Sequence, residues 1–225
     1  MVAVLALPQS LVTKVWLVAG LLIGLALAAC TEPPRPTINL YRAVHSGDLD
    51  QIKRHLYWGT DVNQPGPDGR YPLQVAVADG QVVIARELLD HGASMEVRDP
   101  LGHTPLYVAL ASGRVPAAEL LIEKGAGDDP QVLLRQLVSG DQLDRDSLEL
   151  LLRRGVDLNA LGPEGRAPLH QAVVNDNLKI TKWLLQAEAD VNLVTNSGAT
   201  ALDLAHAAGA DPNLIQILEQ YGAQP

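Results

Sequence analysis

A period of 33 residues is the feature that most constrains how this chain folds. Segments of similar sequence begin at Gly59 (GTDVN), Gly92 (GASME), Gly155 (GVDLN) and Glu188 (EADVN), and Gly125 (GAGDD) divides the longest interval. A second set, YPL, TPL, APL and TAL, begins at residues 71, 104, 167 and 200 and follows the same step. Such a period predicts stacked units, none of which buries its apolar face alone.

Each unit has the residues expected of two short helices joined to a turn. Thr104 can cap a first helix that begins at Pro105, where a missing N–H costs nothing. Small residues fit where two helices approach closely, and these are Ala76, Ala109, Ala172 and Ala205. The first helices are expected to end, with positive φ, at Gly80, Gly113, Asp176 and Gly209. The tips of the following β-hairpins are expected at Gly69, Gly102, Gly165 and Gly198.

The period and the TPLH-like and LLxxGAD-like segments together resemble the ankyrin repeat over about residues 38–223. The resemblance implies an all-α repeat fold for residues 38–225. This is an ankyrin-type α-solenoid of about six helix-turn-helix units with β-hairpin fingers. It also implies a concave face, formed by the finger tips and the first helices, that binds other proteins.

The fourth unit is expected to be degenerate. Only 15 residues separate Gly125 from Gly140, where the equivalent interval elsewhere is 21, and 15 separate Gly140 from Gly155 instead of 12 or 13. About six residues, most of a finger, are therefore missing, and about three are added between the helices. The unit keeps Leu133, but Gln136 replaces the small alanine. The missing finger would leave a notch that a partner's loop could enter.

The N-terminal region resembles a bacterial lipoprotein signal. An apolar stretch at residues 15–29 follows Lys14 and ends in LAAC, whose Cys30 is the chain's only cysteine. Fifteen helical residues span about 22 Å, short of the about 30 Å hydrocarbon core of a membrane. The resemblance to the lipobox implies that residues 1–29 are a cleaved signal peptide and that Cys30 is lipidated. An uncleaved membrane helix is the competing interpretation, and a true start near Val12 is left open.

Residues 30–37 follow as the lipidated cysteine and a tether. Three prolines in the seven residues 31–37 exclude a helix and predict an extended segment that lifts the domain off the membrane.

The net charge of −9 argues against nucleic acid, whose phosphates require a basic face. The sequence has no HExxH, GxSxG or glycine-rich phosphate loop, so we expect no catalysis, no cofactor and no small-molecule substrate. Asp141, Asp144, Asp146 and Glu149 do not match a calcium loop. We expect no metal there and expect Asp146 or Ser147 to cap a helix, although calcium binding by the 141–149 loop is left open.

The family's variable positions, transferred to this sequence, give candidate contacts for another protein of unknown identity. They are Arg70, Gln74, Asp79, His103, Tyr107, Ser112, Arg166, His170, Asn175 and Asn196, with Leu101 added because an exposed leucine in a turn is unexpected. The resemblance also implies that His170 braces a hairpin turn.

These features predict a membrane-anchored ankyrin-repeat lipoprotein that acts as a non-catalytic protein-protein interaction module. Thr31 follows the cysteine in place of the aspartate typical of inner-membrane retention. We therefore expect an outer-membrane protein facing the periplasm, although exposure at the cell surface is also compatible with the sequence. Three more specific roles are compatible as well: an immunity or inhibitor protein for an envelope-targeted toxin or enzyme, an accessory to oxidative-stress defence, and a passive scaffold.

Overall fold

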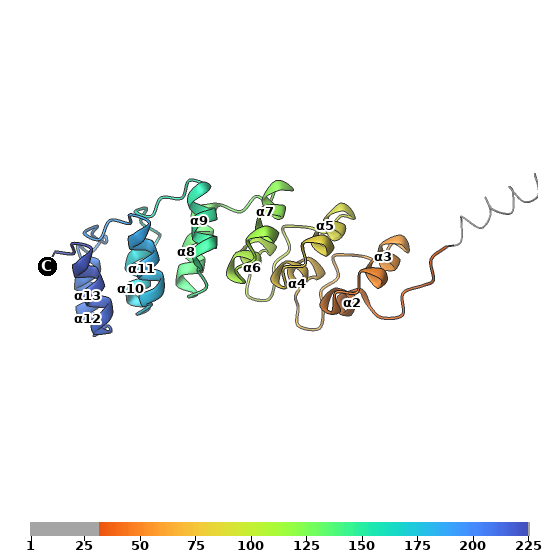
Figure 1. Cartoon of the computed structure of the whole chain (residues 1–225), viewed down its shortest axis with the longest axis horizontal. Coiled ribbons are helices and arrows are strands. Elements are labelled where there is room, and N and C mark those ends of the chain that lie inside the picture. The colour runs from red at the N-terminus through yellow and green to blue at the C-terminus, as the bar shows by residue number, and fades with distance from the viewer. Residues whose placement is uncertain (1–31, 225) are drawn as a thin grey trace, which may run out of the picture.

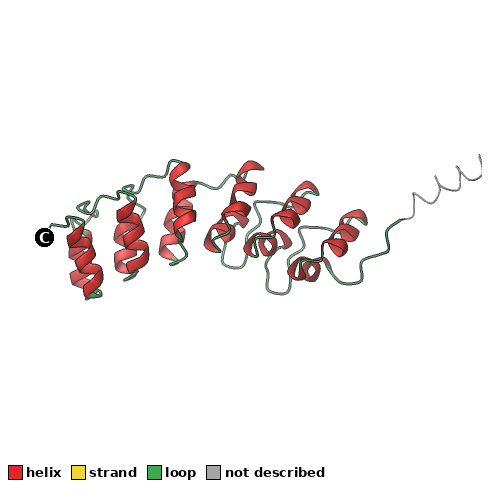
Figure 2. Cartoon of the chain, in the orientation of Figure 1, coloured by secondary structure: helices red, strands yellow, loops and turns green. Residues whose placement is uncertain are grey.

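The computed structural model describes residues 32–224, which form one elongated row of helices (Figure 1). The helices are α2 (Leu40–Ser46), α3 (Leu49–Tyr57), α4 (Pro72–Ala78), α5 (Val82–Asp90), α6 (Pro105–Ala111), α7 (Val115–Glu123), α8 (Pro130–Ser139), α9 (Arg145–Arg153), α10 (Pro168–Val174), α11 (Leu178–Gln186), α12 (Ala201–Ala208) and α13 (Pro212–Gln220). Within residues 32–224 every regular element is a helix (Figure 2). The predicted signal peptide and Cys30 lie outside the described residues.

The twelve described helices form six pairs, which confirms the predicted α-solenoid. Local sequence sets each pair, as α6 shows: Thr104 accepts a hydrogen bond from the Tyr107 N–H at 3.2 Å, and Pro105 opens the helix. The turn after the first helix needs a left-handed residue, and Gly80 and Gly113 supply it with φ of 71° and 65°. Asp176 takes the same conformation in the fifth unit, as predicted.

The units stack through their first helices. Each first helix contacts its own second helix and the first helices of the adjacent units. The four alanines at the predicted close approach, at positions 76, 109, 172 and 205, are fully buried. The core is therefore a continuous stripe of small and aliphatic side chains, and each unit is stabilised mainly by its neighbours.

The fingers between units are hydrogen-bonded turns and not two-stranded hairpins. The Gly66 N–H donates to the Arg70 carbonyl at 2.8 Å, and the Gly162 N–H donates to the Arg166 carbonyl at 2.8 Å. Each closing bond encloses only one further turn bond, so no ladder forms between strands. Glycine occupies the tips as predicted, and Gly69 has φ of 77°.

The fourth unit, made by α8 and α9, departs from the others, but its register differs from the expected one. In the second unit the Ala76 carbonyl accepts the Gln81 N–H at 2.8 Å across the turn. The equivalent carbonyl in the fourth unit belongs to Leu137, which accepts the Gln142 N–H at 2.9 Å. Leu137 is fully buried, whereas Gln136 is exposed. The prediction that Gln136 takes the alanine position is therefore wrong.

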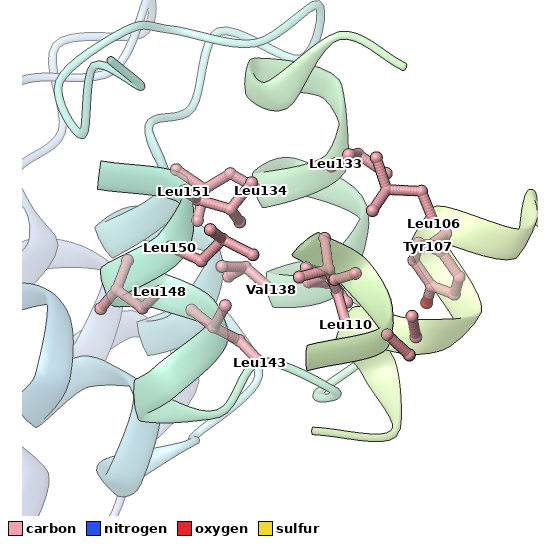
Figure 3. Packing of buried hydrophobic residues seen from close by; sticks show 14 of the residues in the cluster. Leu106, Tyr107, Leu110, Leu133, Leu134, Val138, Leu143, Leu148, Leu150 and Leu151 are labelled. Carbon is pink, nitrogen blue, oxygen red and sulfur yellow. The ribbon is translucent and has the colours of Figure 1, made fainter. Parts of the chain in front are cut away.

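The shift arises at the turn after α8. Asp141 adopts the left-handed conformation, with φ of 54°, whereas Gly140 has φ of −87°. The connection to α9 is longer than in the other units, and Leu143 within it is buried in one apolar cluster with side chains of both helices, such as Val138 and Leu148 (Figure 3). Asp144 caps α9 by accepting the Ser147 N–H at 2.8 Å, so the prediction of Asp146 or Ser147 as the cap is also wrong.

The proline-rich segment packs against the first unit from Pro33 onward, so it is not a free tether. The Trp58 indole donates to the Pro33 carbonyl at 3.2 Å, and the Arg35 guanidinium lies 4.6 Å from the centroid of the same ring. The Thr37 N–H donates to the Gln51 side chain at 2.8 Å. The segment is extended, as its prolines require, but it belongs to the folded domain.

Candidate protein-binding face

The first helices and the fingers form one side of the row. In Figure 1 the first helices α2, α4 and α6 lie below the second helices α3, α5 and α7. This side corresponds to the predicted concave face. The eleven candidate contact residues all lie on its fingers, on its first helices or just after those helices, but their side chains are used in different ways.

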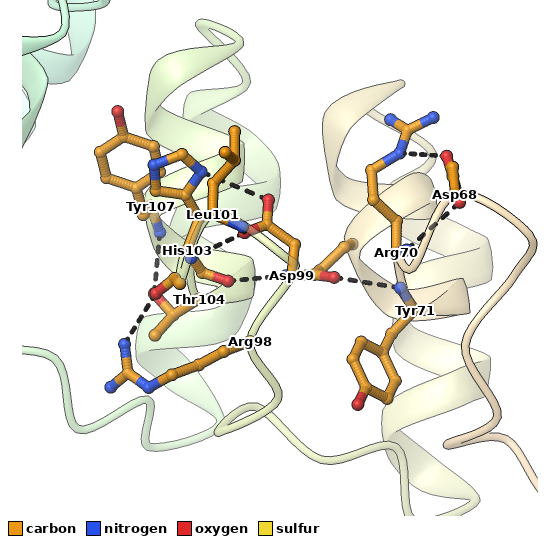
Figure 4. A network of polar contacts seen from close by, with 11 residues as sticks. Asp68, Arg70, Tyr71, Arg98, Asp99, Leu101, His103, Thr104 and Tyr107 are labelled. Atoms are coloured by element: carbon orange, nitrogen blue, oxygen red, sulfur yellow. Dashed lines mark hydrogen bonds and ion pairs between the residues drawn. The ribbon is translucent and has the colours of Figure 1, made fainter.

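The tip of the finger before α4 is held by an ionic cluster (Figure 4). The Asp68 carboxylate accepts the Tyr41 hydroxyl at 2.7 Å and the Arg70 Nε at 2.7 Å. Hydrogen bonds from Tyr41 and then from Arg70 lower the pKa of Asp68 to about 2. Arg70 is thus half-exposed at the predicted place and oriented by Asp68.

Gln74 and His170 are buried braces between successive fingers. The Gln74 side chain accepts the Tyr71 N–H at 3.0 Å and donates to the His103 carbonyl of the next finger at 2.7 Å. His170 accepts the Ala167 N–H at Nδ1, 3.1 Å away, and its Nε2 lies 2.9 Å from the Leu193 carbonyl of the next finger. Both candidate contacts are therefore buried within the fold, and the bracing role expected for His170 is confirmed.

Tyr107 occupies the same position in α6 but has no following finger to brace. Its ring stacks on His103 with centroids 4.1 Å apart, and only 6% of the residue is exposed. Burial, with a smaller contribution from Asp99, raises the pKa of Tyr107. The candidate contact Tyr107 therefore packs within the face, while the half-buried His103 lies beside its ring (Figure 4).

Three candidates lie where first helices end. Asp79 and Ser112 are exposed, and Asp79 lies 3.8 Å from His45 Nδ1. Asn175 is half-buried and donates to the Val138 carbonyl at 3.2 Å and to the Asp141 carboxylate at 3.0 Å. Asn175 thus holds α10 against the end of α8.

The remaining candidates lie on fingers. Leu101 is 79% exposed, the most exposed of the large apolar side chains in residues 32–224. Arg166 is half-exposed, and Asn196 is exposed, with its backbone N–H bonded to the Gly165 carbonyl at 3.0 Å. For these three, and for Arg70, Asp79, His103, Ser112 and Asn175, contact with a partner stays a prediction.

Two hollows flank α8, where the missing finger was expected to leave a notch. One, of about 230 Å³, lies between α8 and the finger at residues 162–166. The other, of about 200 Å³, lies between α8 and the finger at residues 96–102. We call the two hollows and the exposed side of α8 between them the notch. The notch is lined by side chains that were not among the predicted contacts, including Val132 and Arg135. The absence of a finger before α8 was the signal that could have found them.

The acidic residues between α8 and α9 have separate structural roles. Asp144 caps α9, and Asp141 accepts hydrogen bonds from Asn175 and Asn177. In residues 32–224 no group of three or more His, Cys, Asp or Glu side chains comes together to hold a metal ion.

None of the helices in the described part of the chain has both the length and the apolar character needed to cross a membrane.

Comparisons with known proteins agree with this architecture. A family model described as "Ankyrin repeats (3 copies)" matches residues 40–132 and 136–225. Human BCL-6 corepressor-like protein 1 is 47% identical over 60 residues, which are 27% of this chain and 3% of that protein. The chain spans less than half the length of the curated relatives it matches.

Two solved structures are similar over most of the chain. The ankyrin repeat domain of Bcl-3, a member of the IkappaB protein family, is 27% identical with a TM-score of 0.65, and the match covers 85% of this chain and 89% of that one. The other is a chain in the complex of the Bd0816 predatory endopeptidase from Bdellovibrio bacteriovorus with immunity protein Bd3460. It is 25% identical with a TM-score of 0.61, and the match covers 83% of this chain and 99% of that one.

Proposed function

The chain belongs to the ankyrin-repeat family, and on that premise we propose that its concave face binds another protein without catalysing a reaction. The notch is the centre of this binding face. One observation carries the proposal: the row of fingers is interrupted at α8, where apolar side chains face solvent. Leu101 is 79% exposed beside the notch and Val132 is 38% exposed within it. Elsewhere on the face, several side chains are occupied in bracing the fold.

We expect Leu101→Ser combined with Val132→Ser to reduce partner binding at least about tenfold. Fully burying an exposed Leu or Val side chain contributes about 1.5–3 kcal/mol, and tenfold corresponds to about 1.4 kcal/mol. The largely exposed Leu101 should supply most of the effect, because Val132 is already partly buried. The measurement is capture of a partner from solubilised cell envelopes by the full chain in mild detergent. Val83→Ser on α5 is the matched control, because Val83 is 62% exposed on a second helix. Equal capture by the double variant and the control would contradict the proposal.

A membrane anchor at Cys30 is the second part of the proposal. The LAAC segment after an apolar stretch supports a cleaved signal peptide and a lipid on the cysteine. Two or three acyl chains hold a protein on a membrane, whereas one does so only marginally. Thr31 after the cysteine supports an outer-membrane location facing the periplasm.

We expect Cys30→Ser to move the chain from the membrane fraction to the soluble or precursor fraction. Mass spectrometry of the chain without this substitution should show a mature N-terminus at Cys30 with the added mass of a diacylglycerol. A lipid-free chain that retains residues 1–29 would contradict the anchor and favour the uncleaved membrane helix.

An immunity or inhibitor role is the second candidate function. It is favoured by the similarity to a chain in the complex of an endopeptidase with an immunity protein. In that case the protein captured through the notch is an envelope-directed enzyme or toxin, and adding the full chain lowers its activity. If the activity of the captured partner is unchanged, the immunity or inhibitor role is contradicted, while the general protein-binding role still stands.

A further inference from the structure

The hollow between α8 and the following finger contains two guanidinium groups. Arg135 extends from α8 and Arg166 from the finger, and both line the cavity of about 230 Å³. Within residues 32–224 the Arg135 side chain has no ion pair or hydrogen bond. Arg166 has one acidic neighbour, Glu164, at 3.7 Å, and the Glu164 side chain is 76% exposed. Glu164 also lines the hollow, so two arginines and one glutamate leave an excess of one positive charge there, in a chain of net charge −9.

Gly162 makes room for this arrangement. A Cβ added at Gly162 would lie 2.9 Å from the Arg135 Cδ, so any side chain there would push the arginine stem aside. Pro163, Val138 and Pro168 supply apolar walls. Apolar walls lower the local dielectric and strengthen a charge-assisted hydrogen bond made inside. The cavity is also far larger than the about 10–15 Å³ that a single water needs, so a side chain can enter it.

The hollow on the other side of α8 has the opposite character. Glu96, Asp128 and Asp129 line it, with Arg98 as its cation, and Arg98 already donates to the Gly102 carbonyl at 2.9 Å. A negatively charged side chain is repelled on that side and attracted on the side of Arg135. The difference gives the notch a direction, which is how charge placement usually contributes specificity.

We infer that the hollow around Arg135 and Arg166 is a carboxylate-binding site that takes an Asp or Glu side chain from a loop of the protein partner. The inference rests on the proposed function and adds the chemistry of the group recognised. Arginine suits this role because its planar guanidinium donates two parallel hydrogen bonds to a carboxylate. At the wall, the Ser139 hydroxyl is a further donor for the carboxylate. The Gln171 amide already donates to the Asn175 side chain at 2.8 Å and has one N–H left.

The test is a selection of constrained loops from a displayed random library on the full chain in mild detergent. We expect the selected loops to carry Asp or Glu at one fixed position. Their affinity should fall at least about tenfold on a chain with Arg135→Gln and Arg166→Gln, since a hydrogen bond to a charged group contributes about 1.5–3 kcal/mol. Arg154→Gln is the matched control, an exposed arginine on the far side of the fourth unit.

A charge exchange separates recognition from misfolding. A chain with Arg135→Glu and Arg166→Glu should no longer bind the acidic loops. The same chain should bind loops in which the selected Asp or Glu is replaced by Lys. Gly162→Ala should weaken the binding of the acidic loops while leaving the circular dichroism spectrum of the chain unchanged. Selection without enrichment of acidic residues, or equal affinity for the unmodified and Arg-to-Gln chains, would overturn the inference. Envelope capture that depends on Leu101 and Val132 would still support the proposed function.

Discussion

Replacing Leu137 with Ala is expected to lower the free energy of unfolding by about 2–5 kcal/mol. Leu137 is fully buried between α8 and its neighbours, at the position that alanine holds in the other units. Removing its side chain leaves a cavity that packed helices fill only in part. The measurement is thermal or urea unfolding of the full chain in mild detergent, monitored by far-ultraviolet circular dichroism.

Gln136→Ala is the matched control and separates the two possible registers of α8. Gln136 is exposed, so its replacement should change the free energy of unfolding by no more than about 0.5 kcal/mol. A larger loss for Gln136→Ala than for Leu137→Ala would contradict the register seen in the structure and restore the one expected from sequence.

The Leu137→Ala chain should also unfold in two steps. In a repeat array each unit is coupled only to its neighbours, so a weakened unit separates the parts on either side. The fourth unit already lacks the finger that would have continued the bracing from α6. We therefore expect units one to three and units five and six to unfold at different temperatures.

The sequence period was sufficient to predict the solenoid because it records contacts that recur in every unit. Ala109, Gly113 and Thr104 each perform a local task that one residue type does best. The missing finger was predictable for the same reason, since it is a gap in a regular count. The hollows around α8 confirm that the gap leaves space on the face.

What the sequence did not reveal depends on partners far along the chain. Glycine is usually the left-handed residue after a helix, so Gly140 was the natural choice over Asp141. The choice between them depends on which residue of α8 packs against α6 and α10. The burial of Gln74 depends likewise on the His103 carbonyl of the next finger. The docking of residues 33–37 depends on Trp58 and Gln51, whose partners a proline-rich composition cannot indicate.

Replacing His170 with Ala is expected to lower the free energy of unfolding by about 2–5 kcal/mol, because it removes the partners of the Ala167 N–H and the Leu193 carbonyl. His170→Gln should retain most of the stability. Gln74 occupies the equivalent position in α4 and makes the same two kinds of hydrogen bond, one to the helix start and one to the next finger. Equal losses for the Ala and Gln variants would contradict the bracing role.

The same comparison should show a pH dependence that belongs to His170. Burial lowers the pKa of His170 below its ordinary value of 6.5, because the charged imidazolium is poorly solvated there. The folded chain then binds fewer protons than the unfolded chain between the two pKa values, so stability rises with pH across that range. The contribution of the neutral His170 imidazole to the free energy of unfolding is fully present above about pH 6.5. It is lost as the pH falls towards the pKa of His170 in the folded chain. Subtracting the His170→Gln curve from the wild-type curve isolates it, and a flat difference would contradict the neutral, buried imidazole.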